Sequence, residues 1–404
     1  MKKLNSGVLL TAAIALATAS TAQADSLTDG VAKMVSEGSA NLGLRYRFET
    51  VEEDNFKDDA KASTLQTRLT LKTATVNGFT ALLEADDVST IGADEYDSLM
   101  AGEYRGNHSV IADPVGTEIN QAWVKYAFSD SVSSTVGRQR ILHAGQRFVG
   151  GVGWRQNEQT YDALSVNLAD SGITLDYSYI WNVNRIFDGS GTPAVQAPEF
   201  DSDSHILLAS MPVGGGKLSG FVYALDFEEA AALSSMTYGV SYAGSLDPVS
   251  FEATVAQQSD YGDNPVSYDA LYLALEARVA IKPVTLVGGY ELLGSDDGAK
   301  AFATPLATLH KFQGWADLFL ATPNDGIEDL YVGINGAAGK VALGAFFHDF
   351  SSDEGSTDYG SEVDLVATYP LNPHVKIQLK YADYSADDFG VDTQKLWFSV
   401  MANF

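Results

Sequence analysis

Hydrophobic and polar residues alternate along most of this chain, and the last segment, 393–404, shows the pattern clearly. Leu396 and Phe398 fall on one face at a period of two, and Lys395 and Trp397 fall on the other. This alternation is typical of a β-strand with one apolar and one mixed face. With about ten residues, the segment is long enough for a tilted strand to cross a bilayer. By itself, it also fits the last strand of a soluble β-sandwich.

The same alternation predicts eighteen strands after residue 38. We expect them at residues 39–50, 64–74, 79–88, 118–128, 132–140, 160–168, 173–183, 204–212, 217–227, 235–243, 249–258, 269–280, 284–293, 328–335, 340–350, 362–370, 375–384 and 393–404. Beyond residue 24, no stretch approaches the ~18 consecutive apolar residues of a membrane-spanning helix. The pattern therefore predicts an all-β protein.

The connections between these strands alternate in length. Eight are short turns with glycine, proline, asparagine or aspartate, which supply the backbone angles of tight turns. The nine longer loops lie near residues 51–63, 89–117, 141–159, 184–203, 228–234, 259–268, 294–327, 351–361 and 385–392. This order places every long loop at one end of the sheet and both chain ends at the other. It predicts a transmembrane antiparallel β-barrel of about 18 strands, with short periplasmic turns and longer extracellular loops.

Closure of the barrel follows from the properties of lipid, in which every unpaired backbone group costs several kcal/mol. We therefore expect the first and last strands to pair. The last strand, which ends in Phe404, resembles the assembly signal of bacterial outer-membrane barrels. The expected partners are the barrel assembly machinery, through this strand, and the lipid and lipopolysaccharide of the outer membrane.

Composition indicates the cellular compartment of the protein and argues against some classes of function. Residues 1–24 have the basic start (Lys2 and Lys3), short apolar core and small-residue cleavage site of a secretory signal peptide. We predict a periplasmic lead at 25–38 and an outer-membrane barrel at 39–404. The formal charge of −28 becomes two units more negative without the two lysines, which argues against nucleic acid as a partner. Cysteine is absent, so the chain has no disulfide or thiolate metal site.

Strand alternation assigns charged side chains to the inside of the barrel. Basic residues predicted to point inward from the first two and last two strands are Arg45, Arg47, Arg68, Lys72, Lys376, Lys380 and Lys395, with Glu49 as an acidic exception. These four strands become neighbours when the barrel closes. Inward charges elsewhere are largely acidic: Glu84, Asp176, Asp226, Glu252, Glu276, Glu291, Glu362 and Asp364, with Arg278 as a basic exception. Two interpretations stay open: a basic wall that faces an acidic one and directs anions, or local ion pairs that only keep the lumen hydrated.

Two loops are candidates to fill part of the lumen. The first, 141–159, is rich in glycine and carries Arg147 and Arg155, while Arg138 and Arg140 precede it directly. The second, 301–325, has apolar residues at helical spacing, and its Thr-Pro pair at 304–305 predicts a helix start. We expect both loops to fold inward, and the arginines of the first loop to bring positive charge to a constriction. The alternative is a lid on the outer surface.

Three blocks of sequence resemble the alginate-export family of outer-membrane porins. They are NLGLRYRFETVEEDN with STLQTRLTLKT, VGRQRILHAGQRFVGGVGWRQNEQTYDAL, and PLATLHKFQGWADLFLATPNDGIEDLYVG. The resemblance implies an eighteen-strand monomeric barrel with an arginine-rich constriction. It assigns Arg138, His310, Gly314 and Asp317 to the family pattern. The acidic loops of this chain depart from it, because an acidic mouth repels the polyanion alginate at low salt.

Enzymatic and metal-binding functions have little support in the sequence. None of the six histidines lies in a nucleophile elbow, a zinc motif or a phosphate-binding loop. The acidic pairs Asp201/Asp203 and Asp260/Asp263 approach a Ca²⁺ pattern but form no full loop, and solvated surface is the simpler interpretation. We expect no cofactor, no metal and no enzyme activity. The expected function is passive diffusion of small hydrophilic solutes, anionic ones among them, and the alternative is export of an anionic polysaccharide such as alginate.

Overall fold

The computed structural model describes residues 21–98, 106–187 and 197–404, and 18 strands of this part form one antiparallel sheet. The strands are β1 (Ser39–Glu53), β2 (Ala60–Lys72), β3 (Phe79–Glu95), β4 (Gly116–Ala127), β5 (Val132–Gln139), β6 (Thr160–Asp170), β7 (Ile173–Asn184), β8 (Glu199–Val213), β9 (Gly216–Leu225), β10 (Ser235–Leu246), β11 (Val249–Asp260), β12 (Asp269–Ile281), β13 (Val284–Leu293), β16 (Ile327–Ala338), β17 (Val341–Ser351), β18 (Asp358–Pro370), β19 (Val375–Ala386) and β20 (Thr393–Asn403). Each strand pairs with its neighbours in the chain, and all eighteen correspond to predicted strands.

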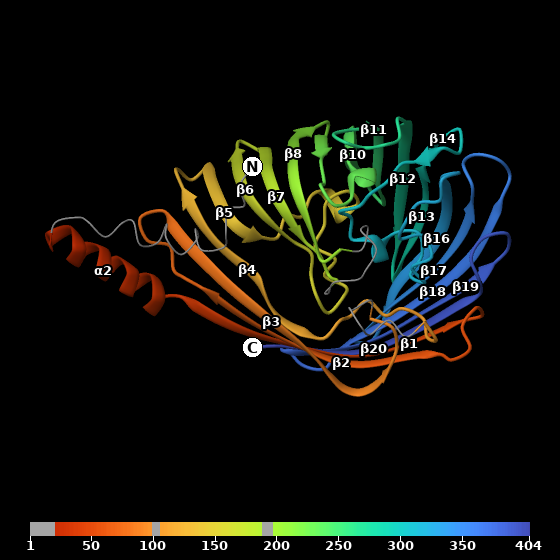
Figure 1. The fold of residues 1–404 in the computed structure, drawn as a ribbon, viewed down its shortest axis with the longest axis horizontal. Helices are drawn as coiled ribbons and strands as arrows, with labels where there is room; N and C mark the ends of the chain where they lie inside the picture. Colours follow the sequence, from red (N-terminus) through yellow and green to blue (C-terminus); the bar gives the residue numbers. More distant parts are fainter. Residues whose placement is uncertain (1–20, 99–105, 188–196) are drawn as a thin grey trace.

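The sheet closes on itself through β1 and β20 (Figure 1). Their register runs from Gly43 opposite Asn403 to Glu53 opposite Thr393. Beyond the last paired residue, Leu42 and Phe404 exchange two backbone hydrogen bonds of 3.0 Å each. The predicted closure is therefore confirmed, and the sheet has no open edge that would expose backbone groups to lipid.

Several strands run further toward the long loops than the alternation predicted. β3 continues to Glu95, where it faces Lys61, and β8 begins at Glu199, where it faces Asn184. Acidic and hydroxyl side chains are frequent at these ends, and Phe200 among them is buried, so the lipid-facing period of two is lost although the backbone ladder continues. Register shifts between Ala62 and Thr64 accompany this change of environment.

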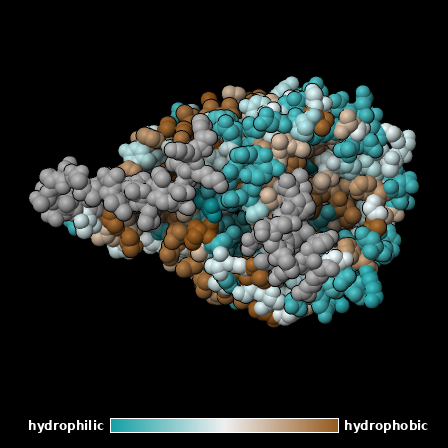
Figure 2. Space-filling model, in the orientation of Figure 1, coloured by the Kyte–Doolittle hydropathy of each residue, from teal (hydrophilic) through white to brown (hydrophobic). Residues whose placement is uncertain are grey.

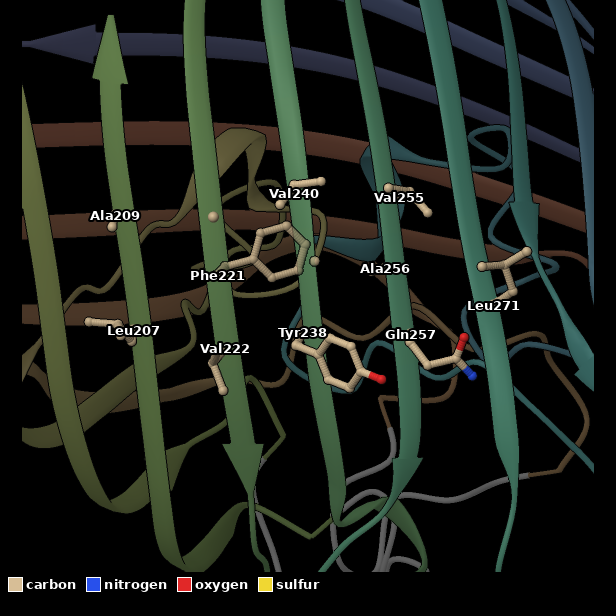
Figure 3. A pocket seen from close by; sticks show the side chains of 12 residues that line it. Leu207, Ala209, Phe221, Val222, Tyr238, Val240, Val255, Ala256, Gln257 and Leu271 are labelled. Carbon is tan, nitrogen blue, oxygen red and sulfur yellow. The ribbon is translucent and has the colours of Figure 1, made fainter. Parts of the chain in front are cut away.

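The outer face of the barrel is apolar, as the alternation predicted. Large hydrophobic side chains that remain exposed include Leu83, Val124, Leu164, Val222, Val240, Leu275, Leu330, Leu343, Leu365 and Leu379. Figure 3 shows this face over β8 to β12, where small residues at Ala209 and Gly220 leave a hollow of about 590 Å³. In Figure 2 hydrophilic residues gather at the end of the molecule farthest from α2. Hydrophobic residues are frequent on the surface between that end and α2. The distribution fits a barrel whose wall contacts lipid.

A helix, α2 (Thr21–Ser36), precedes the first strand and extends from the short-turn end of the barrel (Figure 1). The backbone N–H of Ala74 donates to the Met34 carbonyl over 2.9 Å and ties the helix end to the first turn. The helix spans the predicted cleavage position after Ala24, and residues 1–20 lie outside the described part, so the signal peptide remains a prediction. In the described residues, no helix has the length and apolar character needed to cross a membrane.

Loops 141–159 and 301–325 both fold inside the barrel, so the alternative of a surface lid is wrong. The helix predicted from Thr304 is also wrong: this loop has only a single 3₁₀ turn, Leu309–Lys311. Its backbone instead pairs with the other loop, since Gly150 N–H donates to the Leu306 carbonyl over 2.8 Å. Inter-loop pairing therefore replaces the helical hydrogen bonds. Smaller elements are the ribbon of β14 (Ser295–Asp296) and β15 (Lys300–Ala301) and the turns Ala144–Gln146 and Ala231–Leu233.

Candidate functional site

The two infolded loops, 141–159 and 301–325, brace each other across the lumen, and we call them the constriction loops. Val149 forms a bridge with Leu306, and Thr308 N–H donates to the Gln146 carbonyl over 3.0 Å. On the side-chain level, Thr308 Oγ1 donates to Gln146 Oε1 over 2.7 Å. The two loops are thus one structural unit, although the bridged residues lie far apart in the sequence.

One side of this unit packs on the inner face of β9 to β12. The Phe148 ring lies 4.9 Å from Phe221 and 5.1 Å from Tyr272, measured between ring centroids. Farther along the second loop, Phe319 packs 4.7 Å from Phe350 of β17. These rings belong to the largest buried apolar cluster of the described residues. The constriction loops are therefore fixed to the wall by hydrophobic packing as well as by charge.

The opposite side is held to β1 and β20 by a buried group of charges from these strands and from loops, which we call the anchor cluster. Its members are Arg47, Glu49, Asp113, Arg155, Asp317 and Lys395. Arg155 lies 3.0 Å from both Glu49 and Asp317, and Lys395 donates to Asp317 over 3.1 Å. All six side chains are at most 7% exposed, so each charge depends on its partners for stabilisation.

Lys380 of β19 projects into a group of aromatic rings beside the anchor cluster. Its Nζ lies 3.6 Å from the ring centre of Trp315 and 4.4 Å from that of Trp154. The same ammonium lies 2.6 Å from Nε2 of His310, which stacks on Trp154 with 4.5 Å between ring centres. His310 Nδ1 is 2.7 Å from Asp317. A neutral His310 that donates from Nδ1 and accepts at Nε2 satisfies both contacts.

Burial and neighbouring charges set the protonation of the loop residues at this point. Burial lowers the pKa of His310 well below its usual value, against the opposing effect of Asp317. For Asp317, burial acts to raise the pKa, but His310, Lys395 and Arg155 outweigh it and hold the pKa well below the usual range. Burial would lower the pKa of Arg155, yet Glu49 and the neighbouring aspartates raise it. The geometry thus corresponds to a neutral His310 beside a charged Asp317, which Arg155 and Lys395 stabilise.

Arg147 of the first constriction loop is also saturated. It contacts Glu291 of β13, donates to Thr304 over 3.0 Å and donates to Gln313 over 3.1 Å. The Phe312 ring covers its guanidinium at 4.6 Å. Each of its three guanidinium nitrogens donates to a partner and Glu291 balances its charge, so Arg147 holds the loops to β13 and has little charge to offer to a solute.

Four predicted arginines keep contact with solvent, on the side of β1 to β6. Arg68 is 18%, Arg140 27% and Arg138 31% exposed. Carboxylates meet all three: Arg68 contacts Asp86 and Glu158 at 2.7 Å each, Arg138 contacts Asp162 at 2.8 Å, and Arg140 contacts Glu84 and Glu158. The fourth, Arg45, donates to the Gln156 side chain over 2.8 Å and to the Gly153 carbonyl over 2.9 Å. We call these four the hydrated arginines.

The eleven predicted lining residues therefore fall into three groups. Arg45, Arg68, Arg138 and Arg140 are hydrated, while Arg47, Arg147, Arg155, Lys380 and Lys395 are buried contacts of the constriction loops. Lys72 and Lys376 are exposed near the short-turn ends of their strands, away from the constriction loops. The predicted adjacency of β19, β20, β1 and β2 is confirmed, but loop carboxylates pair with many of their basic side chains. This geometry supports local ion pairing over an uncompensated basic wall.

Sequence reasoning missed the contacts that join the loops to the barrel wall. Asp113, which follows residues 99–105 outside the described part, pairs with Arg47 at 3.5 Å. Glu362, predicted only as a lining acid, accepts hydrogen bonds from the backbone N–H groups of Trp315 and Ala316. The residue assigned by family resemblance at position 314 has a clear role: Gly314 has φ of +75°, and a Cβ there would collide with Glu362. No local pattern marks Asp113 as a partner of Arg47.

A cavity of about 370 Å³ lies inside the barrel, between the constriction loops and β9 to β17, and we call it the inner chamber. Its carboxylates are Glu252, Glu276, Glu291 and Asp329, and its cations are Arg147, Arg278 and Lys311. Tyr331 of β16 lies across Gly289 of β13, where any Cβ would collide with the ring, and its hydroxyl donates to Glu276 over 2.9 Å. Aromatic rings and charged groups thus share this wall.

Comparisons with known proteins agree with the fold. The alginate export family model matches residues 37–182, so the predicted resemblance is confirmed over that part. OccK9 (OpdG) of Pseudomonas aeruginosa is 13% identical, with a TM-score of 0.69 over 92% of this chain and 99% of that one. OccAB2 of Acinetobacter baumannii is 14% identical, with the same TM-score and coverage. OpdK of Pseudomonas aeruginosa, solved with vanillate, is 12% identical, with a TM-score of 0.68 over 92% and 99%. The search of curated proteins found no match. The fold is that of bacterial outer-membrane porins, as predicted.

Proposed function

We propose that this protein is an outer-membrane channel through which small hydrophilic solutes diffuse passively. The observation that carries the proposal is the combination of an apolar outer face with a lumen that holds solvent-exposed arginines and carboxylates. A closed barrel of 18 strands is wide enough for a channel, and the constriction loops reduce that width. Selectivity then depends on pore size and on lining charge.

His310, the histidine at the centre of the constriction, is not placed to act as a general base. His310 has both ring nitrogens engaged, by Asp317 and by Lys380, and the ring is buried. A general base needs a free nitrogen within reach of a substrate proton. The polar groups of the constriction therefore serve to hold the loops and to line the path.

Reconstitution of the full chain tests the proposal. Purified protein in planar bilayers should give single-channel conductance steps, and liposomes that contain it should swell in neutral sugars up to a sharp size limit. The control is the same preparation after heat unfolding. Absence of both conductance and swelling in folded protein would refute a channel function.

Export of an anionic polysaccharide is the second candidate, and the alginate export family match over residues 37–182 favours it. A polyanion needs a continuous row of available cations, and carboxylates already pair with three of the four hydrated arginines. Alginate oligomers added to one side of a bilayer distinguish the candidates. Block of the current by these oligomers, but not by neutral oligosaccharides of equal length, would support the exporter.

A further inference from the structure

The charges of the constriction largely cancel, although the region is rich in arginine. Three hydrated arginines, Arg68, Arg138 and Arg140, face four carboxylates. Those carboxylates are Glu84, Asp86, Glu158 and Asp162. With Arg45 the count is balanced. The three cations and three carboxylates of the anchor cluster also balance and are buried. An arriving anion therefore meets no net positive field at this level.

Charge outside the constriction is strongly acidic. The chain has 53 acidic and 25 basic residues, and the outer wall of the barrel is apolar. Acidic pairs lie in the loops at Asp58-Asp59, Asp296-Asp297, Asp353-Glu354 and Asp387-Asp388, all at the long-loop end. A channel mouth with one sign of charge raises the local concentration of the opposite ion. The mouth therefore concentrates cations.

A second acidic feature lies in the inner chamber. Glu252 of β11 and Glu276 of β12 are direct cross-strand partners, an arrangement that like charges normally disfavour. Arg278 contacts Glu276 at 2.7 Å, but Glu252 is exposed and, among the described side chains, no hydrogen bond or ion pair involves it. The rings of Tyr272, Phe312 and Tyr331 line the same chamber. Carboxylates beside aromatic faces attract ammonium groups, because both present negative potential.

From these three observations we infer that the channel prefers cations, with Glu252 and Glu276 as specificity-determining residues for small ammonium-bearing solutes. The inference rests on the proposed channel function and gives its solute class. It departs from the expected transport of anions, because the arginines that suggested anions are compensated. Lys311, an exposed cation on the chamber wall that donates to the Gly145 carbonyl over 2.8 Å, partly offsets the two glutamates.

Reversal potentials across a KCl gradient test the inference with the full chain in planar bilayers. We expect K⁺ to permeate better than Cl⁻. Glu252→Gln and Glu276→Gln should each lower the K⁺ to Cl⁻ permeability ratio roughly twofold or more, as for a charge acting through screened water, and Lys311→Gln should raise it. The matched control is Asp130→Asn, which removes one exposed carboxylate from a short turn. In liposome swelling, ethanolamine should enter faster than glycolate, a carboxylate of similar size.

The outcomes separate the inference from the proposed function. A channel that conducts but prefers Cl⁻, or whose permeability ratio changes no more in Glu252→Gln and Glu276→Gln than in Asp130→Asn, would overturn the inference and leave the channel intact. Folded protein without any conductance would overturn the proposed function and this inference with it. Because Glu252 is exposed and makes no hydrogen bond or ion pair with another described side chain, Glu252→Gln should fold, which keeps the test decisive.

Discussion

Arg155 is the residue whose loss should loosen the constriction most selectively. Its Nη1 lies 3.1 and 3.0 Å from the two carboxylate oxygens of Glu49, which is fully buried, and its Nη2 lies 3.0 Å from Asp317. The substitution Arg155→Met keeps a flexible, unbranched side chain, shorter than arginine, and removes the guanidinium with its charge. Asp317 retains Lys395 and His310, so the main loss is an uncompensated charge on Glu49.

The size of this effect follows from burial. Removing one partner of a buried ion pair costs about 3–5 kcal/mol. Since each ~1.4 kcal/mol is a factor of ten, the population of detached constriction loops should rise by roughly two to three and a half orders of magnitude. The penalty falls only on the anchored state, because Glu49 is hydrated once the loop has left. The barrel itself should stay folded.

Amide hydrogen exchange in residues 146–158 measures the detached population directly. The matched control is Arg278→Met, which removes an ion pair of 2.7 Å whose partners are 52% and 29% exposed. Exposed pairs contribute about 0–1 kcal/mol, so this control should change exchange in the same segment by less than about fivefold. Equal exchange rates in the two variants would show that the anchor cluster does not hold the loops, and the reasoning would fail.

Three further outcomes are expected. Gly314→Ala should displace the second constriction loop and speed exchange around it, because its positive φ and its proximity to Glu362 both oppose a Cβ, at about 1–3 kcal/mol; unchanged exchange would contradict this. Loop anchoring should weaken as pH falls below ~6.5, the pKa of a detached histidine, because the pKa of anchored His310 is lowered and only the detached loop gains the proton. Below ~3.9 anchoring should weaken further, because the pKa of anchored Asp317 is also lowered and the detached carboxylate is protonated first. His310→Gln should abolish the first of these two steps in a pH series of exchange measurements. Val400→Pro should prevent barrel assembly, because it removes a ladder hydrogen bond between β20 and its neighbours within the lipid-spanning part. The loss should be visible in gels as the absence of the heat-modifiable band. A heat-modifiable band at the usual yield would contradict the closure argument.

The sequence was sufficient to predict the barrel, because every strand that crosses the membrane alternates between apolar residues that face lipid and polar residues that face water. β13 was predicted at residues 284–293, and the structure has the same bounds. Where the wall rises out of the bilayer this alternation no longer applies, so the first residues of β8 and β18 were missed. At these positions the backbone ladder continues, and Phe200 and Tyr359 are buried against the loop rings of Phe227 and Phe319, so the alternation set by lipid carries no signal.

The constriction could be predicted only in outline. The glycine-rich loop and its arginines indicated an infolded segment, but their electrostatic effect depends on partners that are distant in sequence, such as Asp113 for Arg47. The helix prediction failed for a related reason. Leu306 meets the first loop, Phe312 covers Arg147 and Trp315 covers Lys380, so residues at helical spacing serve three different surfaces.

The bridge between Val149 and Leu306 limits how such a channel can change its aperture. Shortening one of the two loops would not simply widen the passage, because the carbonyl and amide groups of the surviving loop would lose their partners in a confined space. Relatives with a wider or narrower passage should therefore differ in both loops together. Engineering of the aperture should treat them as a pair and exchange both in a single step.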